Sequence, residues 1–424
     1  MNILFVHQNF PGQFKHLAPA LGANPQHSVV GFTMNRRPTL AGVQIVQYRP
    51  GKGSTPGIHP WIVDLESKVI RGEIAFKAAR KMRDEHGFTP DVILAHPGWG
   101  ESLFLKEIWP QARLLIYCEW YYPLKGADFG FDPEFASAEP EAICRLRMKN
   151  AHNLLAMEAA DAGISPTHWQ RSTHPAWFQP RIVVEHDGVD TRHVAPRSHH
   201  QALRLDIPAD EACAIAQGTV SVQPGAEIVT FVNRNLEPYR GYHVFMRALP
   251  ELLRRRPKAQ VIIVGGNGVS YGAAAPPGTT WKKLFLDEVR DDLDLSRVHF
   301  VGNIPYTAFV SLLQRTTVHV YLSYPFVLSW SLIEAMACGG AIVGSDTEPV
   351  REVITEAETG RLVNFFDKAG LVERICELLD DPAQRARLGA RARELAVDRY
   401  DLRSRCLPMQ TAIVERLGAP RGAR

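Results

Sequence analysis

The stretch Thr317–Ile354 decides the fold of this chain and reads TVHVYLSYPFVLSWSLIEAMACGGAIVGSDTEPVREVI. Its first apolar run, Val318–Leu322, has the length and the β-branched residues of a buried strand. A proline-broken loop follows, and Ser331–Ala337 has helical character that ends at a Gly-Gly pair, as at a helix C-cap. Ala341–Val343 begins a second buried strand. The stretch therefore predicts a strand, a loop, a helix and another strand.

The start of the predicted helix is a candidate anion site. A helix that begins at the end of a parallel strand leaves backbone N–H groups unpaired and turns the positive end of its dipole toward the loop. Such a place binds phosphate or a developing anion, and the hydroxyls of Ser329 and Ser331 can add donors. Glu334 lies one turn into the helix, on the side that can face a ligand. The spacing Ser331-x-x-Glu334 also fits a capping box, and spacing alone leaves both interpretations open.

With these residues in place, the stretch resembles the signature of the retaining glycosyltransferases of family four, which have the GT-B fold. That signature carries two glutamates on either side of a Gly-Phe-Gly turn. The segment Glu334–Gly339, EAMACG, matches its second half, and the resemblance gives Glu334 the role of holding the donor ribose. Phe326 stands where the first glutamate, which contacts the transferred sugar, would be, and Val-Leu-Ser replaces the Gly-Phe-Gly. The resemblance therefore leaves recognition of the donor sugar open.

The rest of the chain repeats the alternation of strand and helix. Strand-length apolar runs alternate with helical segments twice, with a segment of no clear periodicity between the two series. This pattern predicts an α/β protein of two doubly wound domains. The resemblance implies the GT-B architecture, two Rossmann-like parallel-sheet domains with a cleft between them. We expect an acceptor-side domain over 1–195, a linker with some local helix over 196–225, a nucleotide-sugar-binding domain over 226–400, and a final helix over 401–424 that crosses back to the first domain.

A second candidate site follows the predicted strand Glu227–Val232. The loop behind it, Asn233–Gly241, reads NRNLEPYRG and opens a helix, with Arg234 near its start and Arg240 near its end. Guanidinium groups form charge-assisted, bidentate hydrogen bonds that suit diphosphate oxygens. A pair of surface arginines is the alternative that the residues alone leave open. The resemblance favours the site, because the family has an arginine and a lysine at this spacing, both on the donor diphosphate.

The resemblance also implies a wider set of donor contacts. In the first loop of the chain, Gly12 lets the backbone come close to another group. A simple turn glycine is the alternative, whereas the resemblance implies contact with the donor phosphate. Behind the predicted strand Val298–Gly302, the backbone is implied to read the nucleobase. The implied donor-binding residues are Gly12, Asn303, Ile304, Phe326, Leu328, Ser329, Trp330, Ser331 and Glu334.

Candidate acceptor residues follow two predicted strands of the first domain, Asp91–Ala95 and Leu114–Cys118. His96 and Trp99 come after the first strand, and Glu119 comes directly after the second. Ligands of open α/β sheets collect at the carboxyl ends of the strands. Aromatic faces and a carboxylate suit a carbohydrate acceptor, and packing of Trp99 between domains is the alternative.

Composition excludes several classes of function. The chain has 424 residues, 45% of them hydrophobic, which suits two or more cored domains. A formal net charge of +3 is too balanced to predict nucleic-acid binding. The six cysteines include no CxxC pair, and Asp292-Leu293-Asp294 reads as a solvated helix end rather than a metal motif. No stretch approaches the roughly 20 apolar residues of a membrane span. We expect a cytoplasmic protein, at the inner face of the membrane where its acceptor is lipid-linked.

These observations predict a retaining glycosyltransferase without a bound cofactor or metal. A sugar passes from a nucleoside-diphosphate sugar, the co-substrate, to a glycan, lipid-linked or small-molecule acceptor. The predicted catalytic residues are Arg234, Arg240 and Glu334, and we expect Arg234→Ala or Arg240→Ala to lose transfer with little loss of stability. Two alternatives stay open. One is a GT-B protein that binds nucleotide or glycan without turnover, which the altered Phe326–Ser329 segment motivates, and the other is a GT-B epimerase or inverting transferase.

Overall fold

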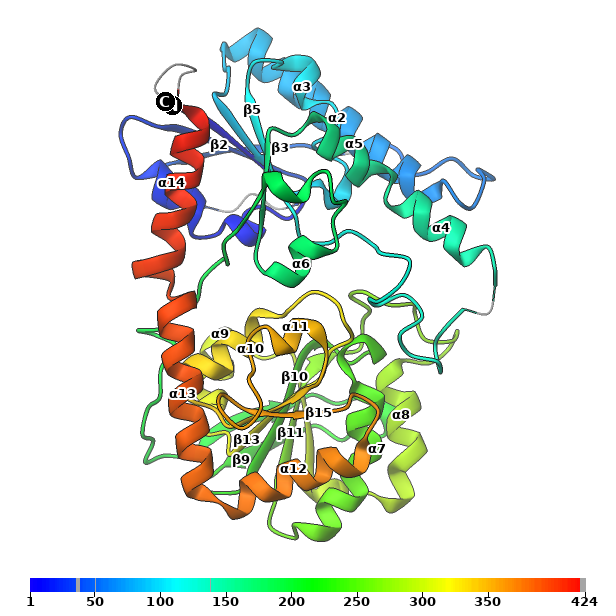
Figure 1. The fold of residues 1–424 in the computed structure, drawn as a ribbon. Coiled ribbons are helices and arrows are strands. Elements are labelled where there is room, and N and C mark those ends of the chain that lie inside the picture. Colours follow the sequence, from blue (N-terminus) through cyan, green and yellow to red (C-terminus); the bar gives the residue numbers. More distant parts are fainter. Residues whose placement is uncertain (36–38, 50, 138, 420–424) are drawn as a thin grey trace. The chain divides into compact units, whose positions relative to one another are not determined.

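The computed structural model describes residues 1–35, 39–49, 51–137 and 139–419, and its chain divides into two compact units (Figure 1). Unit 1 comprises Met1–Gly188 together with Leu402–Arg424, and unit 2 comprises Val189–Asp401. Residues 420–424 of the predicted final segment lie outside the described residues. Each unit is built on a parallel sheet, so the doubly wound α/β architecture predicted from the alternation is confirmed.

Unit 1 contains a seven-stranded sheet in which all neighbouring strands run parallel. The strand order is β3-β2-β1-β4-β5-β6-β7. The central strands are buried on both faces, which is why they are continuous apolar runs in the sequence. The strands are β1 (Asn2–Val6), β2 (Ser28–Thr33), β3 (Val43–Gln47), β4 (Val92–Ala95), β5 (Arg113–Tyr117), β6 (Ala162–Ser165) and β7 (Ile182–Val184).

Helices cover both faces of this sheet. The helices of unit 1 include α1 (Leu17–Gly22), α2 (Val63–His86), α3 (Leu105–Ile108), α4 (Ala142–Lys149), α5 (Ala151–Ala159), α6 (His168–Ser172) and α14 (Leu407–Gly418). α1 and α14 pack on one face with Phe5 and Leu94 of the strands. α2, α3 and α5 pack on the other face with Leu4 and Ile93. Because side chains alternate along a strand, each apolar run contributes to both cores.

Unit 2 contains a six-stranded parallel sheet with the order β12-β11-β10-β13-β14-β15. The strands are β10 (Ile228–Asn235), β11 (Gln260–Gly266), β12 (Val298–Gly302), β13 (Val318–Tyr321), β14 (Ile342–Ser345) and β15 (Arg361–Val363). The helices are α7 (Tyr242–Arg255), α8 (Trp281–Val289), α9 (Tyr306–Leu313), α10 (Trp330–Ala337), α11 (Glu348–Arg351), α12 (Lys368–Asp380) and α13 (Pro382–Tyr400).

The two faces of the unit 2 sheet carry different helices. Side chains of α9, α10 and α13 form one core, together with Ile262 and Val264 of β11. On the opposite face Phe245 of α7 stacks on Phe231 of β10 with ring centres 4.5 Å apart. α8 and α12 flank α7 on that face (Figure 1).

The segment 196–225 differs from the expected linker with local helix. It forms an antiparallel hairpin of β8 (Leu203–Ile207) and β9 (Gly218–Val222), and it belongs to unit 2. Leu205 and Val220 join the core with α9 and α10. The alternation of apolar and polar residues in both short strands has the period of two that a half-buried strand needs. Many Pro, His and Ala residues flank the two strands, so the alternation of apolar and polar residues did not stand out in the sequence.

Both sheets have a switch point, where the strand order turns from one direction to the other. In unit 1 this point lies between β1 and β4, and in unit 2 between β10 and β13. The loops that leave neighbouring strands here diverge and open a crevice at the carboxyl ends of the strands. The first loop of the chain and the His96 loop meet at one switch point, and the Arg240 and Phe326 loops at the other. In the described part of the chain, no helix is both long enough and apolar enough to cross a membrane.

Candidate active site

Arg240 is buried at the switch point of unit 2. It ends a short 3-10 turn after β10, and 4% of its surface is exposed. Its Nη1 donates to Ser323 Oγ at 2.8 Å and to the carbonyl of Val327 at 2.9 Å, both in the loop behind β13. Its guanidinium lies 5.0 Å from the centre of the Tyr271 ring. Its hydrogen-bond partners are neutral, and within the described residues no carboxylate forms an ion pair with it. The buried carboxylate of Glu237 is a nearby charge, but no ion pair joins it to Arg240 in the described part of the chain, so an anion can still bond to the guanidinium directly.

Arg234 differs from Arg240 in its position in the fold and in the exposure of its side chain. The strand β10 runs three residues further than predicted, so Arg234 lies on the strand end, and its side chain is exposed. Within the described residues it forms no ion pair. Of the predicted pair, Arg234 is therefore exposed to ligands in solvent, whereas Arg240 holds the loop behind β13 in place through hydrogen bonds. The stability of both alanine variants stays a prediction, and for Arg240 we now expect a loss, because its side chain is buried and hydrogen-bonded.

The loop behind β11 completes the surroundings of Arg240. The carboxylate of Glu237, itself buried, accepts hydrogen bonds from the amides of Ser270 and Tyr271 at 3.2 Å. Asn235 Oδ1 accepts from the amide of Gly268 at 3.1 Å. Two polar residues of the Arg234–Arg240 segment thus hold the neighbouring loop in place, so that Tyr271 stays against the guanidinium.

The helix α10 begins with Ser329 and not with Ser331. Ser329 has an extended backbone, and its Oγ accepts from the amide of Ser331 at 3.3 Å, as an N-cap residue does. The capping box Ser331-x-x-Glu334 is therefore absent. Glu334 instead lies in the second turn, where its Oε1 accepts from the hydroxyl of Tyr306 at 2.7 Å. Burial and the Glu334 charge raise the pKa of Tyr306, so the phenol stays a donor to this carboxylate.

The amides at the start of α10 are partly used inside the protein. The amide of Ser329 donates to the hydroxyl of Tyr321 at 2.8 Å, and that hydroxyl also lies 3.5 Å from Arg240 Nη1. The side chains of Ser329 and Ser331 share a hydrogen bond of 3.0 Å. Both serines and Trp330 remain partly exposed, so the hydroxyls and the positive end of the helix are accessible. The helix start is thus tied to Arg240 through Tyr321.

Phe326 lies in an aromatic cluster. It is 4% exposed, and its ring centre lies 5.3 Å from that of Tyr239 and 5.0 Å from that of Tyr271. Tyr239 in turn contacts Tyr324 at 4.8 Å. An apolar face therefore occupies the place that the resemblance gives to a sugar-binding carboxylate. Leu328 is also buried and belongs to the core of α10, so only its backbone can serve a ligand.

The implied nucleobase residues lie in the turn behind β12. Asn303 is exposed, and the side chain of Ile304 packs against the unit 2 core. Gly266, at the end of β11, has no side chain, and a Cβ there would lie 2.9 Å from Asn303 Nδ2 and 2.9 Å from Asn235 Oδ1. The ends of β10, β11 and β12 therefore come together here.

In unit 1 the predicted acceptor residues do come together. His96 Nε2 lies 3.4 Å from Glu119 Oε2, and the ring of His96 lies 4.5 Å from that of Trp99. The amide of Gly98 donates to His96 Nδ1 at 3.1 Å, so Nε2 carries the proton that faces the carboxylate. Burial would raise the pKa of Glu119, but its contacts with His96 and Gln13 outweigh burial and hold that pKa below its ordinary value. The Glu119 side chain is 33% exposed, so a ligand can reach it.

Two residues of the first loop extend this cluster. Gln13 donates to Glu119 Oε1 at 3.0 Å and accepts from His7 Nε2 at 2.7 Å. Burial and the nearby His96 lower the pKa of His7 to about 3, so this histidine stays neutral. Gly12, with φ of +48°, is needed because a Cβ there would lie 2.4 Å from the His7 ring. The glycine thus has a close neighbour in unit 1, and its contact with a donor phosphate stays a prediction.

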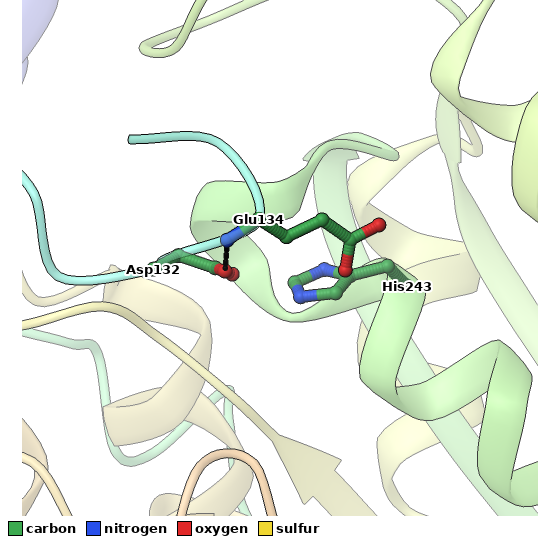
Figure 2. A group of neighbouring side chains, drawn as sticks. All are labelled: Asp132, Glu134 and His243. Atoms are coloured by element: carbon green, nitrogen blue, oxygen red, sulfur yellow. Dashed lines mark hydrogen bonds between the residues drawn. The ribbon is translucent and has the colours of Figure 1, made fainter. Parts of the chain in front are cut away.

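Asp294 and Asp132, two acidic residues that could suggest a metal site, form an ion pair or a hydrogen bond within the protein. Asp294 caps a surface turn and pairs with Arg297 at 2.6 Å, in agreement with the solvated interpretation of Asp292-Leu293-Asp294. Figure 2 shows Asp132, whose Oδ1 accepts a hydrogen bond from the amide of Glu134 at 3.0 Å. Both residues belong to unit 1, whereas His243 in the same view belongs to unit 2. The three therefore carry no metal assignment.

The sequence does not point to several residues of these clusters. Tyr306, the first residue of α9, carries no local signal, because its partner Glu334 comes 28 residues later in the chain. Glu237 lies between Arg234 and Arg240, and Gln13 directly follows Gly12, so a polar residue beside a candidate loop is a usable signal. Ser323 and Tyr321 carry no local signal, because their partner Arg240 is about 80 residues away in the chain.

Two family models match the chain. "Glycosyl transferase family 4 group" matches residues 25–194, and "Glycosyl transferases group 1" matches residues 219–395. Among curated relatives, the D-inositol 3-phosphate glycosyltransferase of Corynebacterium efficiens is 26% identical over 265 residues, which is 62% of this chain and 57% of the relative. The phosphatidyl-myo-inositol mannosyltransferase of Mycolicibacterium smegmatis is 32% identical over 180 residues, 41% of each chain. The chain thus spans about half the length of the curated relatives it matches.

Solved structures show the same fold over nearly the whole chain. Sucrose-phosphate synthase from Thermosynechococcus elongatus aligns with a TM-score of 0.67 at 19% identity and covers 99% of this chain and 100% of its own. HepE from Anabaena, solved in complex with UDP, aligns with a TM-score of 0.63 at 15% identity, covering 98% of this chain and 99% of its own. The chain therefore resembles the glycosyl transferase family 4 group over residues 25–194 and the group 1 glycosyl transferases over residues 219–395, and it has the GT-B fold.

Proposed function

We propose that this protein transfers a glycosyl group from a nucleoside-diphosphate sugar with retention of configuration. Arg240 carries this proposal, since its buried guanidinium has neutral partners and no ion pair with a carboxylate among the described residues. The diphosphate of a donor is an anion that can form the direct charge-assisted hydrogen bonds that this guanidinium does not make to a carboxylate. Arg234, near the end of β10, is exposed and can approach the same anion from solvent.

The chemistry follows from where charge develops. As the bond between the sugar and the diphosphate breaks, the leaving oxygens gain negative charge, and the sugar takes on oxocarbenium character. Arg240, Arg234 and the positive end of α10 stabilise that charge. The acceptor hydroxyl then attacks from the face that the diphosphate leaves, and its proton passes to a phosphate oxygen. The donor acts as a co-substrate, and the charge of its diphosphate is met by the cationic side chains.

Glu334 is proposed to hold the donor ribose. Its Oε1 accepts from Tyr306, and this bond fixes the carboxylate in the second turn of α10. The nucleobase is proposed to lie at the turn of Asn303 and Ile304, where three strand ends meet. Structural neighbours were solved with UDP and with UDP-glucose, which supports a uridine or related nucleotide here.

The acceptor is proposed to bind unit 1 at His96, Trp99 and Glu119. A carboxylate held by a histidine, beside an indole face, suits a polyol or a sugar. Relatives named for inositol 3-phosphate and phosphatidyl-myo-inositol support a polyol, as a free or a lipid-linked acceptor. We further propose a cytoplasmic location, in which a lipid-linked acceptor would bring the protein to the inner surface of the membrane.

Nucleotide binding and product analysis test the proposal together. We expect UDP, GDP or ADP to bind the full-length protein in isothermal titration, and a donor sugar to raise its melting temperature. The anomeric configuration of the product, read by NMR, should match that of the donor. Inversion would refute retention, and absence of binding by every nucleotide would refute the transferase assignment.

The buried Phe326 favours one second candidate, a protein that binds the donor without turning it over. The family resemblance places a sugar-contacting carboxylate at this position, and here the side chain is apolar and enclosed by tyrosines. A donor-hydrolysis assay separates the two candidates. Release of free sugar or transfer to an acceptor supports the enzyme, and tight donor binding with neither supports the binding protein.

A further inference from the structure

The hairpin β8–β9 lies at one edge of the unit 2 sheet, and its connecting turn approaches the carboxyl ends of the strands. β8 lies beside β12, which is the edge strand. The first strand of the hairpin and its turn fall between the two stretches that the family models match, which end at residue 194 and resume at residue 219. The turn is therefore a feature that neither family description accounts for.

Asp210 ties this turn to the loop behind β11. Its Oδ2 accepts from Lys282 Nζ at 2.8 Å and from Asn267 Nδ2 at 3.0 Å. Its Oδ1 accepts from the amide of Cys213 at 3.2 Å, which closes the turn. The side chains of Asp210 and Lys282 are only 10% and 6% exposed. A shielded ion pair adds little net stability, so its use here is to fix one geometry.

Pro208 touches the second loop of the same rim. Gly302 ends β12 with φ of +62°, and a Cβ there would lie 3.2 Å from Pro208 Cγ. Asn303 and Ile304 follow directly. The hairpin turn thus packs against the backbone that presents Asn303, while Asp210 holds Asn267 one strand away.

We infer that the hairpin turn, residues 208–213, positions the Asn303 turn, where the nucleobase is proposed to lie, and the neighbouring Asn267 loop, and thereby sets which nucleoside diphosphate the protein accepts. This inference rests on the proposed function. A site discriminates between bases when its hydrogen-bonding groups are held in place, because a mobile group can adapt to either base. Asp210 and Pro208 are positioning residues, since they act through Asn267 and Gly302 and not through the ligand.

Binding of three nucleotides to the full-length protein tests the inference. We would measure Kd for UDP, GDP and ADP by isothermal titration, for the wild type, for Asp210→Asn and for Pro208→Ala. The preference for the best base over the others should fall about tenfold in Asp210→Asn and about threefold in Pro208→Ala. Arg204→Ala is the matched control, because Arg204 is an exposed residue of β8 in the same hairpin. It should keep the wild-type preference.

A second variant covers the case in which Asp210→Asn does not fold, since that change leaves Lys282 buried without its partner. The double variant Asp210→Asn with Lys282→Met removes both charges and keeps the apolar stem. A fall in base preference in a folded Asp210 or Pro208 variant, with the preference of Arg204→Ala unchanged, supports the inference. Equal weakening of all three nucleotides, or an unchanged preference in folded Asp210-altered and Pro208→Ala proteins, overturns it. Failure of the wild type to bind any of the three would instead refute the proposed function.

Discussion

Replacing Arg240 by alanine separates the structural role of this side chain from its role at the donor. The change removes two hydrogen bonds from a charged donor, at 2.8 Å to Ser323 and 2.9 Å to Val327. Each such bond is worth about 1.5–3 kcal/mol. Removal of a buried charge returns part of this, because the guanidinium is no longer desolvated. We expect a net loss of about 2 kcal/mol in the free energy of unfolding.

A loss of this size is measurable in a melting curve. For a unit of roughly 200 residues, about 2 kcal/mol lowers the melting temperature by about 4–8 °C. The loop behind β13 should loosen at the same time, because Val327 and Ser323 lose their partner. Hydrogen exchange in this loop, followed by mass spectrometry, would show the change locally.

Arg234→Ala is the informative partner of this variant. Arg234 is exposed and has no ion pair among the described residues, so its loss should change stability by less than about 0.5 kcal/mol. Transfer should nevertheless fall about 10²-fold, if the cation stabilises the leaving diphosphate. Arg204→Ala, another exposed arginine of unit 2, should keep both stability and turnover.

The pair of variants makes the reasoning refutable. Melting and turnover should be measured on the same samples, with donor saturating. An Arg240→Ala protein that melts at the wild-type temperature would contradict the bracing role. An Arg234→Ala protein that turns over at the wild-type rate would contradict its role at the donor. Arg240→Lys keeps a cation and loses the forked geometry, so it should retain more transfer than alanine does.

Three further predictions follow from single contacts. Tyr306→Phe removes the hydroxyl that holds Glu334, so the donor KM should rise several-fold while kcat changes little, as initial-rate kinetics would show. The pKa of His7 is about 3 in the fold against 6.5 ordinarily, so the unfolded chain takes up the proton first and stability falls as the pH drops from 6.5 toward 3. His7→Gln should reduce this slope by up to about 1.4 kcal/mol per pH unit, measured by urea unfolding at several pH values. Gly12→Ala, at φ of +48° and 2.4 Å from the His7 ring, should cost about 1–2 kcal/mol in thermal unfolding and displace His7 from Gln13, and an unshifted melting curve would contradict this.

Much of the fold follows from local patterns. The strand of Val318–Leu322 and the helix of Ser331–Ala337 occur within one residue of their predicted bounds, because apolar periodicity and the glycine C-cap act over a few residues. The hairpin over 196–225 was not predicted, because its stability depends on contacts with residues far away in the sequence. Its two strands are short, and each is stable only because its apolar residues join the core of α9 and α10.

The candidate site was predictable only in part. The sequence placed His96, Trp99 and Glu119 at the ends of two strands, and the rule for parallel sheets then brings them to one edge. It also singled out the loop between Arg234 and Arg240. It did not distinguish the exposed arginine from the buried one, because burial depends on the loop behind β13, which comes some 80 residues later.

The sequence by itself determined the alternation of elements, the two parallel sheets, and which loops gather at the carboxyl ends of their strands. These are consequences of periodicity and chain direction, which local residues specify. Only the tertiary structure shows that Ser329 caps α10 and that Phe326 is enclosed by tyrosines. It also shows that the Glu334 carboxylate accepts a hydrogen bond from the Tyr306 hydroxyl and not from the Ser331 amide. The surroundings of Glu334 and Phe326 depend on Tyr306, Tyr239 and Tyr271, which come from other segments of the chain, and no local pattern encodes which of these lies beside them.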